Sequence, residues 1–219
     1  MTRKNVVKIC ALSDFHGILP KVPECDLCII AGDICPQFDH ADFFQLSWVT
    51  TSFKIWLEEI PAKHIVGIAG NHDFIFESRK INLPWNYLQD SSVEIEGIKI
   101  HGTPHVKGSK SWAFSHEEEE LEEIWKNLPY CDILVSHCPP FGTADDDGFG
   151  TNIGSISLKN KIEEMKIPMV VCGHAHENYG IHKMNNCEVL NVAMAYNGYD
   201  PKSVKLANVP MMYPYDRKK

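Results

Sequence analysis

Carboxylate, carboxamide and imidazole side chains follow five short apolar runs of this chain. In sequence order they are Asp14 and His16; Asp33; Asn71, His72 and Asp73; His137; and His174 and His176. In open α/β sheets, ligands bind beyond the carboxyl ends of the strands, so groups at these positions can meet at one place. Asp14 and His16 are two residues apart, so in extended backbone their side chains leave the same face. The pair His174 and His176 has the same spacing.

Oxygen and nitrogen ligands without cysteine suit a site for manganese, iron or zinc better than they suit a structural zinc site, which is rich in thiolates. Seven of these residues can act as ligands, which is too many for one ion but fits two ions that share a bridging carboxylate. Any one of the motifs alone carries little information. Five of them in order, each at the end of an apolar run, predict a two-metal site.

The elements that position these groups can be read from the apolar patterns. Continuous apolar runs predict strands buried on both faces: Val6–Leu12, Leu27–Ala31, Ile65–Ala69, Ile133–Val135 and Met169–Cys172. Helices are predicted over Ala41–Ile60, over His116–Leu128 with Ser115 as N-cap, and over Ile156–Met165. Alternating residues predict hairpins over Val93–Ile100 and Gly180–Leu190. The pattern is typical of a layered α/β protein, and we expect one domain over residues 1–219.

Composition narrows the class of protein further. The chain has 219 residues and a formal net charge of -8, which argues against the broad basic surface that long nucleic acids require. Its sequence contains no apolar run of the ~18 residues that span a membrane. Its 8 cysteines are too sparse for a disulfide scaffold and fit reduced core thiols. We therefore expect a cytoplasmic protein that binds neither membranes nor long nucleic acids.

The motifs in order resemble those of the calcineurin-like metallophosphoesterase superfamily: Asp14-x-His16, Gly32-Asp33, Gly70-Asn71-His72-Asp73, His137 and Gly173-His174-x-His176. Further segments resemble its branch of metallophosphoesterase-domain-containing phosphodiesterases: Gly102-Thr103-Pro104, His137-Cys138-Pro139-Pro140-Phe141-Gly142, Gly173-His174-Ala175-His176-Glu177 and Leu190-Asn191-Val192-Ala193. The arginine that often follows the second motif in phosphoprotein phosphatases is missing. His174 is retained where some members of the branch have glycine.

The resemblance implies a four-layer α-β-β-α sandwich with two mainly mixed sheets and a dimetal site at the carboxyl ends of the strands. It implies two divalent ions, with Mn²⁺ favoured and Fe, Zn, Ni or Co as alternatives. The implied ligands of the first ion are Asp14, His16, Asp33 and His176. Those of the second are Asp33, Asn71, His137 and His174, with Asp33 bridging the two.

The resemblance also implies a mechanism, in which a hydroxide activated by the two metals attacks phosphorus. His72 is then expected to stabilise phosphoryl charge and to protonate the leaving oxygen. We expect Asp73 to orient the imidazole of His72 and to favour its charged form. His105, beside Gly102-Thr103-Pro104, is a candidate substrate contact, although a structural role is favoured for it. His40, His64, His116 and His182 are expected at the surface or at sheet edges.

The expected function is hydrolysis of small phosphodiesters of the nucleotide or cyclic-nucleotide type. A phosphomonoesterase or a nuclease with the same dimetal chemistry is an alternative. A rival of another class is a catalytically silent binding scaffold built on the same fold. Complete ligand motifs argue against that scaffold, and a metal analysis distinguishes the two.

Overall fold

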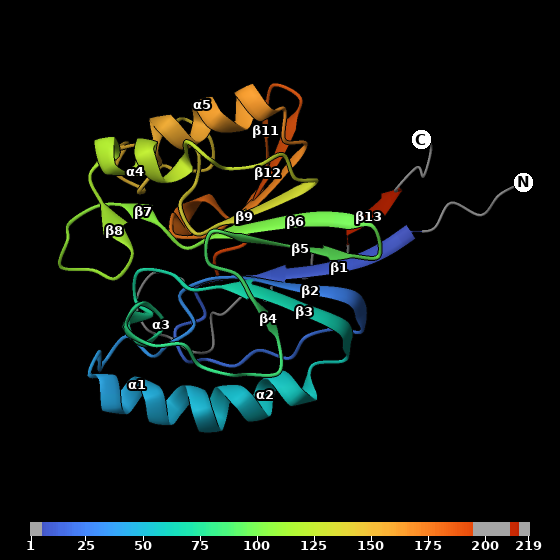
Figure 1. Ribbon diagram of the computed structural model, residues 1–219, viewed down its shortest axis with the longest axis vertical. Helices are drawn as coiled ribbons and strands as arrows, with labels where there is room; N and C mark the ends of the chain where they lie inside the picture. Colours follow the sequence, from blue (N-terminus) through green and yellow to red (C-terminus); the bar gives the residue numbers. More distant parts are fainter. Residues whose placement is uncertain (1–5, 195–210, 215–219) are drawn as a thin grey trace, which may run out of the picture.

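The computed structural model describes residues 6–194 and 211–214, which form two large β-sheets with helices outside them (Figure 1). The first sheet has the order β13 (Met211–Pro214), β1 (Val6–Leu12), β2 (Cys25–Ala31), β3 (Ala62–Ile68) and β4 (Asn86–Tyr87). Strands β1 to β4 are parallel to their neighbours, whereas β13 pairs antiparallel with β1. The carboxyl ends of β1, β2 and β3 therefore lie at one edge.

The second sheet has the order β11 (Gly180–Met184), β12 (Cys187–Asn191), β10 (Met169–Cys172), β9 (Ile133–Ser136), β6 (Ile98–Thr103) and β5 (Ser91–Ile95). Its four central strands are parallel. The outer strands β5 and β11 are added by hairpins, as the alternating patterns predicted. A small separate pair, β7 (Val106–Lys107) and β8 (Ser115–His116), lies outside both sheets.

Helical segments cover the outer faces of the two sheets (Figure 1). Below the first sheet runs a continuous stretch of α1 (Asp42–Trp48), a π-helical segment η1 (Val49–Phe53) and α2 (Lys54–Glu59). Above the second sheet lie α4 (Glu118–Trp125) and α5 (Ile156–Met165). Two short helices, α3 (Phe74–Ser78) and the 3₁₀ turn η2 (His176–Asn178), directly follow ligand motifs.

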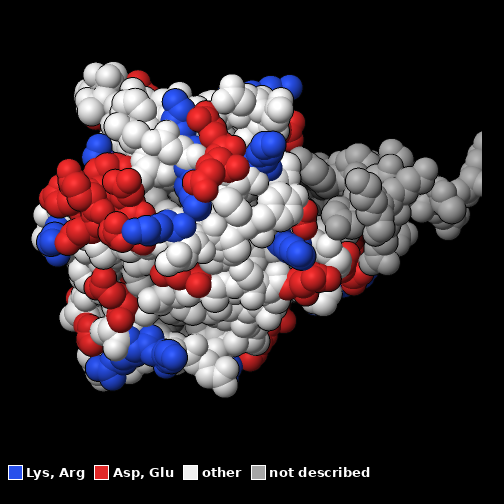
Figure 2. All heavy atoms as spheres, turned by 45° about the horizontal axis from the view of Figure 1, so that its top comes forward, with Lys and Arg blue, Asp and Glu red and all other residues white. Residues whose placement is uncertain are grey.

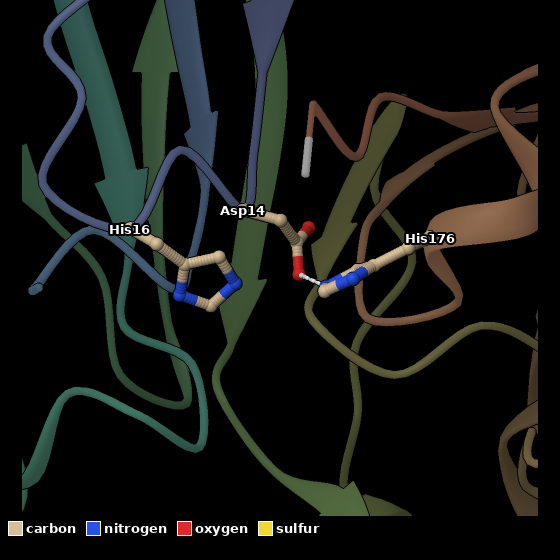
Figure 3. Close-up of side chains that lie close together, drawn as sticks. All are labelled: Asp14, His16 and His176. Carbon is tan, nitrogen blue, oxygen red and sulfur yellow. Dashed lines mark hydrogen bonds and ion pairs between the residues drawn. The ribbon is translucent and has the colours of Figure 1, made fainter. Parts of the chain in front are cut away.

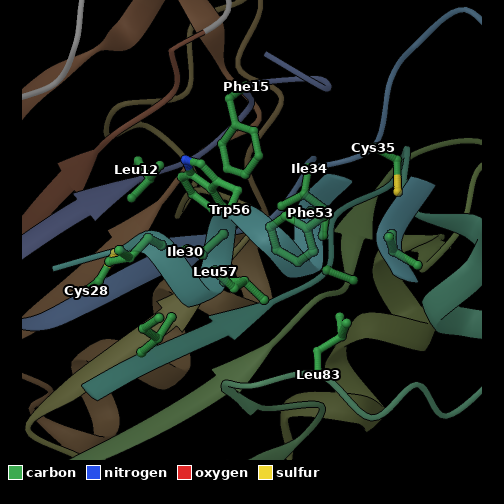
Figure 4. Packing of buried hydrophobic residues seen from close by; sticks show 14 of the residues in the cluster. Leu12, Phe15, Cys28, Ile30, Ile34, Cys35, Phe53, Trp56, Leu57 and Leu83 are labelled. Carbon is green, nitrogen blue, oxygen red and sulfur yellow. The ribbon is translucent and has the colours of Figure 1, made fainter. Parts of the chain in front are cut away.

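Alternate residues of the central strands enter different cores because successive side chains leave opposite faces of a strand. In β2, Cys28 and Ile30 pack with Phe53 and Trp56 from the first helical layer (Figure 4). Leu27, Ile29 and Ala31 of the same strand instead face the second sheet. A third core lies between the second sheet and helices α4 and α5. Strands buried on both faces explain the continuous apolar runs of the sequence.

The α/β class and the order of its elements are confirmed by the structure. One helix start was predicted wrongly. Ser115 lies in β8, whose register pairs it with Val106, and α4 starts later, with Glu117 at its N-cap position. The backbone N–H of Glu117 donates to the carboxylate of Glu120 over 3.2 Å. The acceptor at this helix start is therefore a glutamate carboxylate and not the hydroxyl of Ser115.

Within residues 6–194 and 211–214, no helix combines the length and the apolar character needed to cross a membrane.

Candidate metal centre

The two sheets bring the carboxyl ends of β1, β2, β3, β9 and β10 to one region, and the predicted site residues lie just beyond these ends. Two tight groups of possible metal ligands form there. In each group the nitrogen or oxygen donor atoms all lie within 4.8 Å of one another. Asp14 belongs to both groups.

The first group consists of Asp14, His16 and His176 (Figure 3). The Asp14 carboxylate lies between the two imidazoles, and its Oδ1 is 3.1 Å from Nε2 of His176. The same carboxylate accepts the backbone N–H of His174 over 3.1 Å. The first and last motifs of the chain therefore meet on one buried aspartate.

The second group consists of Asp14, Asp33 and His137. Oδ2 of Asp33 is 3.4 Å from Nε2 of His137 and 3.9 Å from Nε2 of His16. Asp33 thus faces a histidine of each group. Asn71 joins on the same side, with its Oδ1 3.2 Å from Nε2 of His137. The imidazole of His174 lies alongside, with its ring centre 5.3 Å from that of His137.

The chemistry of these donors fits divalent cations. Both ring nitrogens of His16 are buried without a hydrogen-bond partner, which is costly for an imidazole unless a ligand completes it. Burial lowers the pKa of His16 to about 4, so the ring is neutral at pH 7, the form that binds a metal. Nδ1 of His137 contacts the carbonyl of Ala31 over 2.7 Å, which leaves its Nε2 directed at Asp33 and Asn71.

Electrostatics at His137 also favour a cation. Burial alone lowers the pKa of this imidazole, but the carboxylate of Asp33 raises it to about 10. A positive charge is therefore stabilised between Asp33 and His137. A metal ion can take the place of that proton, because ligation requires the deprotonated nitrogen.

Each of three ligand motifs contains a strained backbone position. Asp14, His16, Asp33 and His174 have φ angles of 54°, 43°, 52° and 67°, in the left-handed region that non-glycine residues seldom adopt. Such conformations cost of order 1–3 kcal/mol each and persist where the surrounding structure enforces them. Their gathering at these positions indicates that this region is built to aim side chains.

Two glycines in the motifs are required by close approach. A Cβ atom on Gly70 would collide with the carboxylate of Asp33, and one on Gly173 would collide with that of Asp14. The glycines therefore leave room for the two carboxylates of the ligand groups.

His72 lies beside Asp33 with its ring against other rings. Its backbone N–H donates to Oδ1 of Asp33 over 2.8 Å, and its Nε2 is 3.9 Å from Oδ2. Its Nδ1 is 3.3 Å from Nε2 of His40, a residue expected at the surface. The carbonyl of His72 accepts a 2.8 Å hydrogen bond from the buried Gln45 of α1, whose side chain also accepts from the N–H of Ile75.

Asp73 has partners other than the predicted one. Its carboxylate accepts the backbone N–H groups of Ile34, Cys35 and Gly70 over 2.8 to 3.2 Å. Burial, followed by the charge on Asp33, raises the pKa of Asp73 to about 6. The prediction that Asp73 orients the imidazole of His72 and favours its charged form is therefore corrected: Asp73 ties together the turns after β2 and β3, His40 contacts the ring, and burial lowers the pKa of His72.

His105 is hydrogen-bonded away from the two ligand groups. Its Nε2 is 2.8 Å from Oδ2 of Asp90, and its Nδ1 is 2.9 Å from Nε2 of His116. Asp90 also accepts from the hydroxyl of Thr103. These contacts join β6 to β8 and give His105 a structural setting.

Sequence reasoning missed three neighbours of His72: His40, Gln45 and Trp112. Gln45 is a fully buried polar residue within the predicted helix Ala41–Ile60, but helical periodicity does not show what a polar side chain contacts. Trp112 lies in the loop between β7 and β8, 4.5 Å from His72 between ring centres. Only the packing of separate elements brings these residues together.

Comparison with known proteins gives consistent results. The sequence profile of the family described as calcineurin-like phosphoesterase matches residues 7–178. A UPF0046 protein of Caenorhabditis elegans is 28% identical, over 90% of this chain and 80% of its own length. Metallophosphoesterase domain-containing protein 1 of Homo sapiens is 27% identical, over 87% of this chain and 67% of its own length.

Two solved structures have a similar fold at low sequence identity. A protein of Thermus thermophilus has a TM-score of 0.56 and 15% identity, covering 87% of this chain and 92% of its own. The phosphopantetheinyl hydrolase of Mycobacterium tuberculosis has a TM-score of 0.53 and 14% identity, covering 90% of each chain. At these identities the likeness concerns the fold alone.

Proposed function

From the premise that this chain belongs to the calcineurin-like phosphoesterase family, we propose that it hydrolyses small phosphodiesters of the nucleotide or cyclic-nucleotide type at a two-metal centre. The observation that carries the proposal is the cluster of Asp and His donor atoms, with both nitrogens of the buried His16 lacking a partner. A metal-free binding scaffold would leave those nitrogens unsatisfied. The same observation therefore favours a metal-loaded protein over a metal-free scaffold.

The two ions would be held by the residues that the motifs indicated. Asp14, His16, Asp33 and His176 are proposed for the first, and Asp33, Asn71, His137 and His174 for the second. Bound there, divalent ions would supply Lewis-acid stabilisation of phosphoryl oxygens and activation of water. Oxygen and nitrogen ligands without thiolate suit Mn²⁺, which is the proposed metal. The same ligands suit Fe, Zn, Ni or Co, which are the alternatives.

His72 is the proposed general acid for the leaving oxygen. Its side chain is 17% exposed, so a substrate can reach it, and its Nε2 faces the carboxylate that both metals would share. His40 at the opposite nitrogen fixes the ring orientation. Proton transfer from a positioned side chain of this kind contributes ~10²–10⁴-fold.

A small substrate is supported by the charge distribution. On the face shown in Figure 2, basic side chains occur singly or in small groups among acidic ones, and acidic side chains form one dense group. A long polyanion needs a continuous basic surface, whereas a single phosphate needs only a local cation. The eight buried cysteine side chains are compatible with action in the cytoplasm, which forms part of this proposal.

The test combines a metal analysis with a substrate screen. Protein purified with Mn²⁺ is expected to retain two equivalents and to hydrolyse bis-p-nitrophenyl phosphate or a cyclic nucleotide faster than p-nitrophenyl phosphate. Asp33→Asn is expected to lose both metal and turnover, because Asp33 faces both ligand groups. Hydrolysis of the monoester alone would favour a phosphomonoesterase, and two bound metals without hydrolysis of any ester would favour a binding protein.

A further inference from the structure

The imidazole of His72 lies against the indole of Trp112. The two ring centres are 4.5 Å apart, and the planes meet at 48°. His72 is in turn 5.0 Å from the ring of His16, between ring centres. One ring therefore separates Trp112 from a predicted metal ligand.

Trp112 is held firmly although it lies in a loop. Its neighbour Ala113 donates its backbone N–H to the carbonyl of Asn71 over 3.2 Å. The next residue, Phe114, donates its N–H to the carboxylate of Glu77 over 2.7 Å. The loop is thus anchored on the same turn that carries Asn71 and His72, and the indole is positioned before any ligand arrives. Preorganisation of this kind lowers the entropic cost of binding.

The indole is packed against other rings and is also partly exposed. The ring of His40 meets Trp112 edge-on at 5.4 Å, and that of Phe74 lies 6.1 Å away, both between ring centres. Even so, 38% of Trp112 is exposed. A single exposed aromatic residue is common on protein surfaces and needs no explanation. An anchored indole next to the proposed acid is different, because a group attached to the leaving oxygen would lie within its reach.

We propose that the exposed part of the Trp112 indole is a subsite that stacks the nucleobase of a nucleoside phosphate ester bound at the proposed metal centre. This inference rests on the proposed function and adds to it the residue that would bind the base of the substrate. Indole offers a wide flat surface on which every base can stack, so such a subsite favours nucleotides over alkyl phosphates without strict choice among bases.

The test measures binding, so it does not depend on turnover. Calorimetric titrations of the manganese-loaded protein with AMP and with ribose 5-phosphate compare two ligands that share a phosphoryl group and differ in the base. Wild type is expected to bind AMP about tenfold more tightly than ribose 5-phosphate, a difference within the range that base stacking on an aromatic side chain provides. Trp112→Ala is expected to remove this preference and leave ribose 5-phosphate binding unchanged, and Trp112→Phe to retain part of it.

A matched control is Tyr130→Ala. Tyr130 is 48% exposed and precedes β9, at the end of that strand away from the site. This variant is expected to keep the full preference for AMP. The proposal is overturned if wild type fails to bind AMP, or binds AMP and ribose 5-phosphate equally. It is also overturned if Trp112→Ala weakens the binding of AMP and of ribose 5-phosphate equally. The same holds if the binding of phosphocholine, a phosphate ester with a cationic group and no base, depends on Trp112 more strongly than the binding of AMP does.

The outcomes separate this inference from the proposed function. Hydrolysis of diesters by a protein with no preference for AMP would remove the subsite and leave the enzyme. A preference that depends on Trp112, in a protein that hydrolyses no ester, would keep the nucleotide subsite and remove the activity.

Discussion

The histidines around Asp33 differ in what contacts their second ring nitrogen. Nδ1 of His137 is occupied by the Ala31 carbonyl, and Nδ1 of His72 by His40. Both nitrogens of His16 lack a partner. A histidine fixed at one nitrogen presents the other in a defined direction, as a metal ligand or a proton donor requires. The partner of the second ring nitrogen therefore distinguishes the proposed roles of these histidines.

His72→Ala is expected to retain both metals and to lose turnover by ~10²–10⁴-fold, because the variant removes a proton donor but no proposed ligand. Metal content by mass spectrometry and steady-state kinetics of diester hydrolysis check this. Full activity in the variant would exclude His72 as the acid, and loss of a metal would make it a ligand.

His174→Gly is expected to reduce bound metal from two equivalents towards one and to raise the manganese requirement. The substitution should not strain the backbone, because His174 has φ 67°, a conformation that glycine adopts more readily than histidine does. Metal content after gel filtration is the measurement. Lys166→Gly is a matched control, because Lys166 has φ 54° at the end of α5, and it should keep both metals.

At the scale of elements, sequence patterns located the central strands of both sheets and missed how α4 begins. The pattern predicted β1, β10 and α5 with the bounds that the structure shows, because a strand buried on both faces and an amphipathic helix follow from local order. Serine was expected to cap α4, yet it is Ser155 that caps α5, with its hydroxyl accepting the N–H of Leu158. Which serine acts as a cap depends on tertiary neighbours that the sequence does not show.

Ser155→Ala is expected to lower the free energy of unfolding by about 1–2 kcal/mol, since it removes both the cap of α5 and a hydrogen bond to Glu118. Guanidinium unfolding followed by circular dichroism is the measurement. Ser157→Ala removes a hydroxyl from the same carboxylate but no cap, and should cost less. Equal losses in the two variants would contradict the capping role.

Glu118 gives the junction of α4 and α5 a dependence on pH. Burial acts to raise its pKa, but hydrogen bonds from Ser155 and Ser157 outweigh burial and lower it. A carboxyl with a lowered folded pKa stabilises the fold above its unfolded value of about 4.5, and the stabilisation is lost as pH falls through the folded value. Glu118→Gln should therefore be less stable than wild type at pH 7, with the difference shrinking by pH 3. A difference constant with pH would contradict this.

At the scale of the whole molecule, the cysteines lie in the two cores that the helices cover, four in each, and none in the core between the sheets. All eight are buried, and burial raises the pKa of their thiols, to about 11 for Cys10 and about 12 for Cys131, Cys138 and Cys187. Thiolate is the reactive form, so buried thiols with raised pKa values are inert. The spacing Cys25-x-x-Cys28 thus corresponds to two core residues of β2.

The native protein is expected not to react with Ellman's reagent at pH 8 over minutes, and to release eight equivalents of thiol once unfolded in guanidinium. Free glutathione measured alongside controls for the reagent. One or more thiols that react rapidly in the native state would show that a core opens easily or that a cysteine is activated.

The packing of the whole molecule explains why the gathering of the candidate ligands could be predicted and their surroundings could not. The types and order of Asp14, Asp33 and His137 can be read directly from the sequence. His40 and Trp112 contact His72 only because separate loops are packed on one turn. The role assigned to Asp73 failed for the same reason. Adjacent residues suggested a pair, but the carboxylate turns towards backbone amides of another loop.

The contact between Asp14 and His176 joins residues 162 positions apart. A ribosome makes Asp14 well before His176, so the carboxylate has no imidazole partner from η2 until residue 176 has left the exit tunnel. A nascent chain therefore cannot complete the ligand group of Asp14, His16 and His176 before residue 176 has emerged. With the proposed ligand set, fragments that end before His176 should be inert.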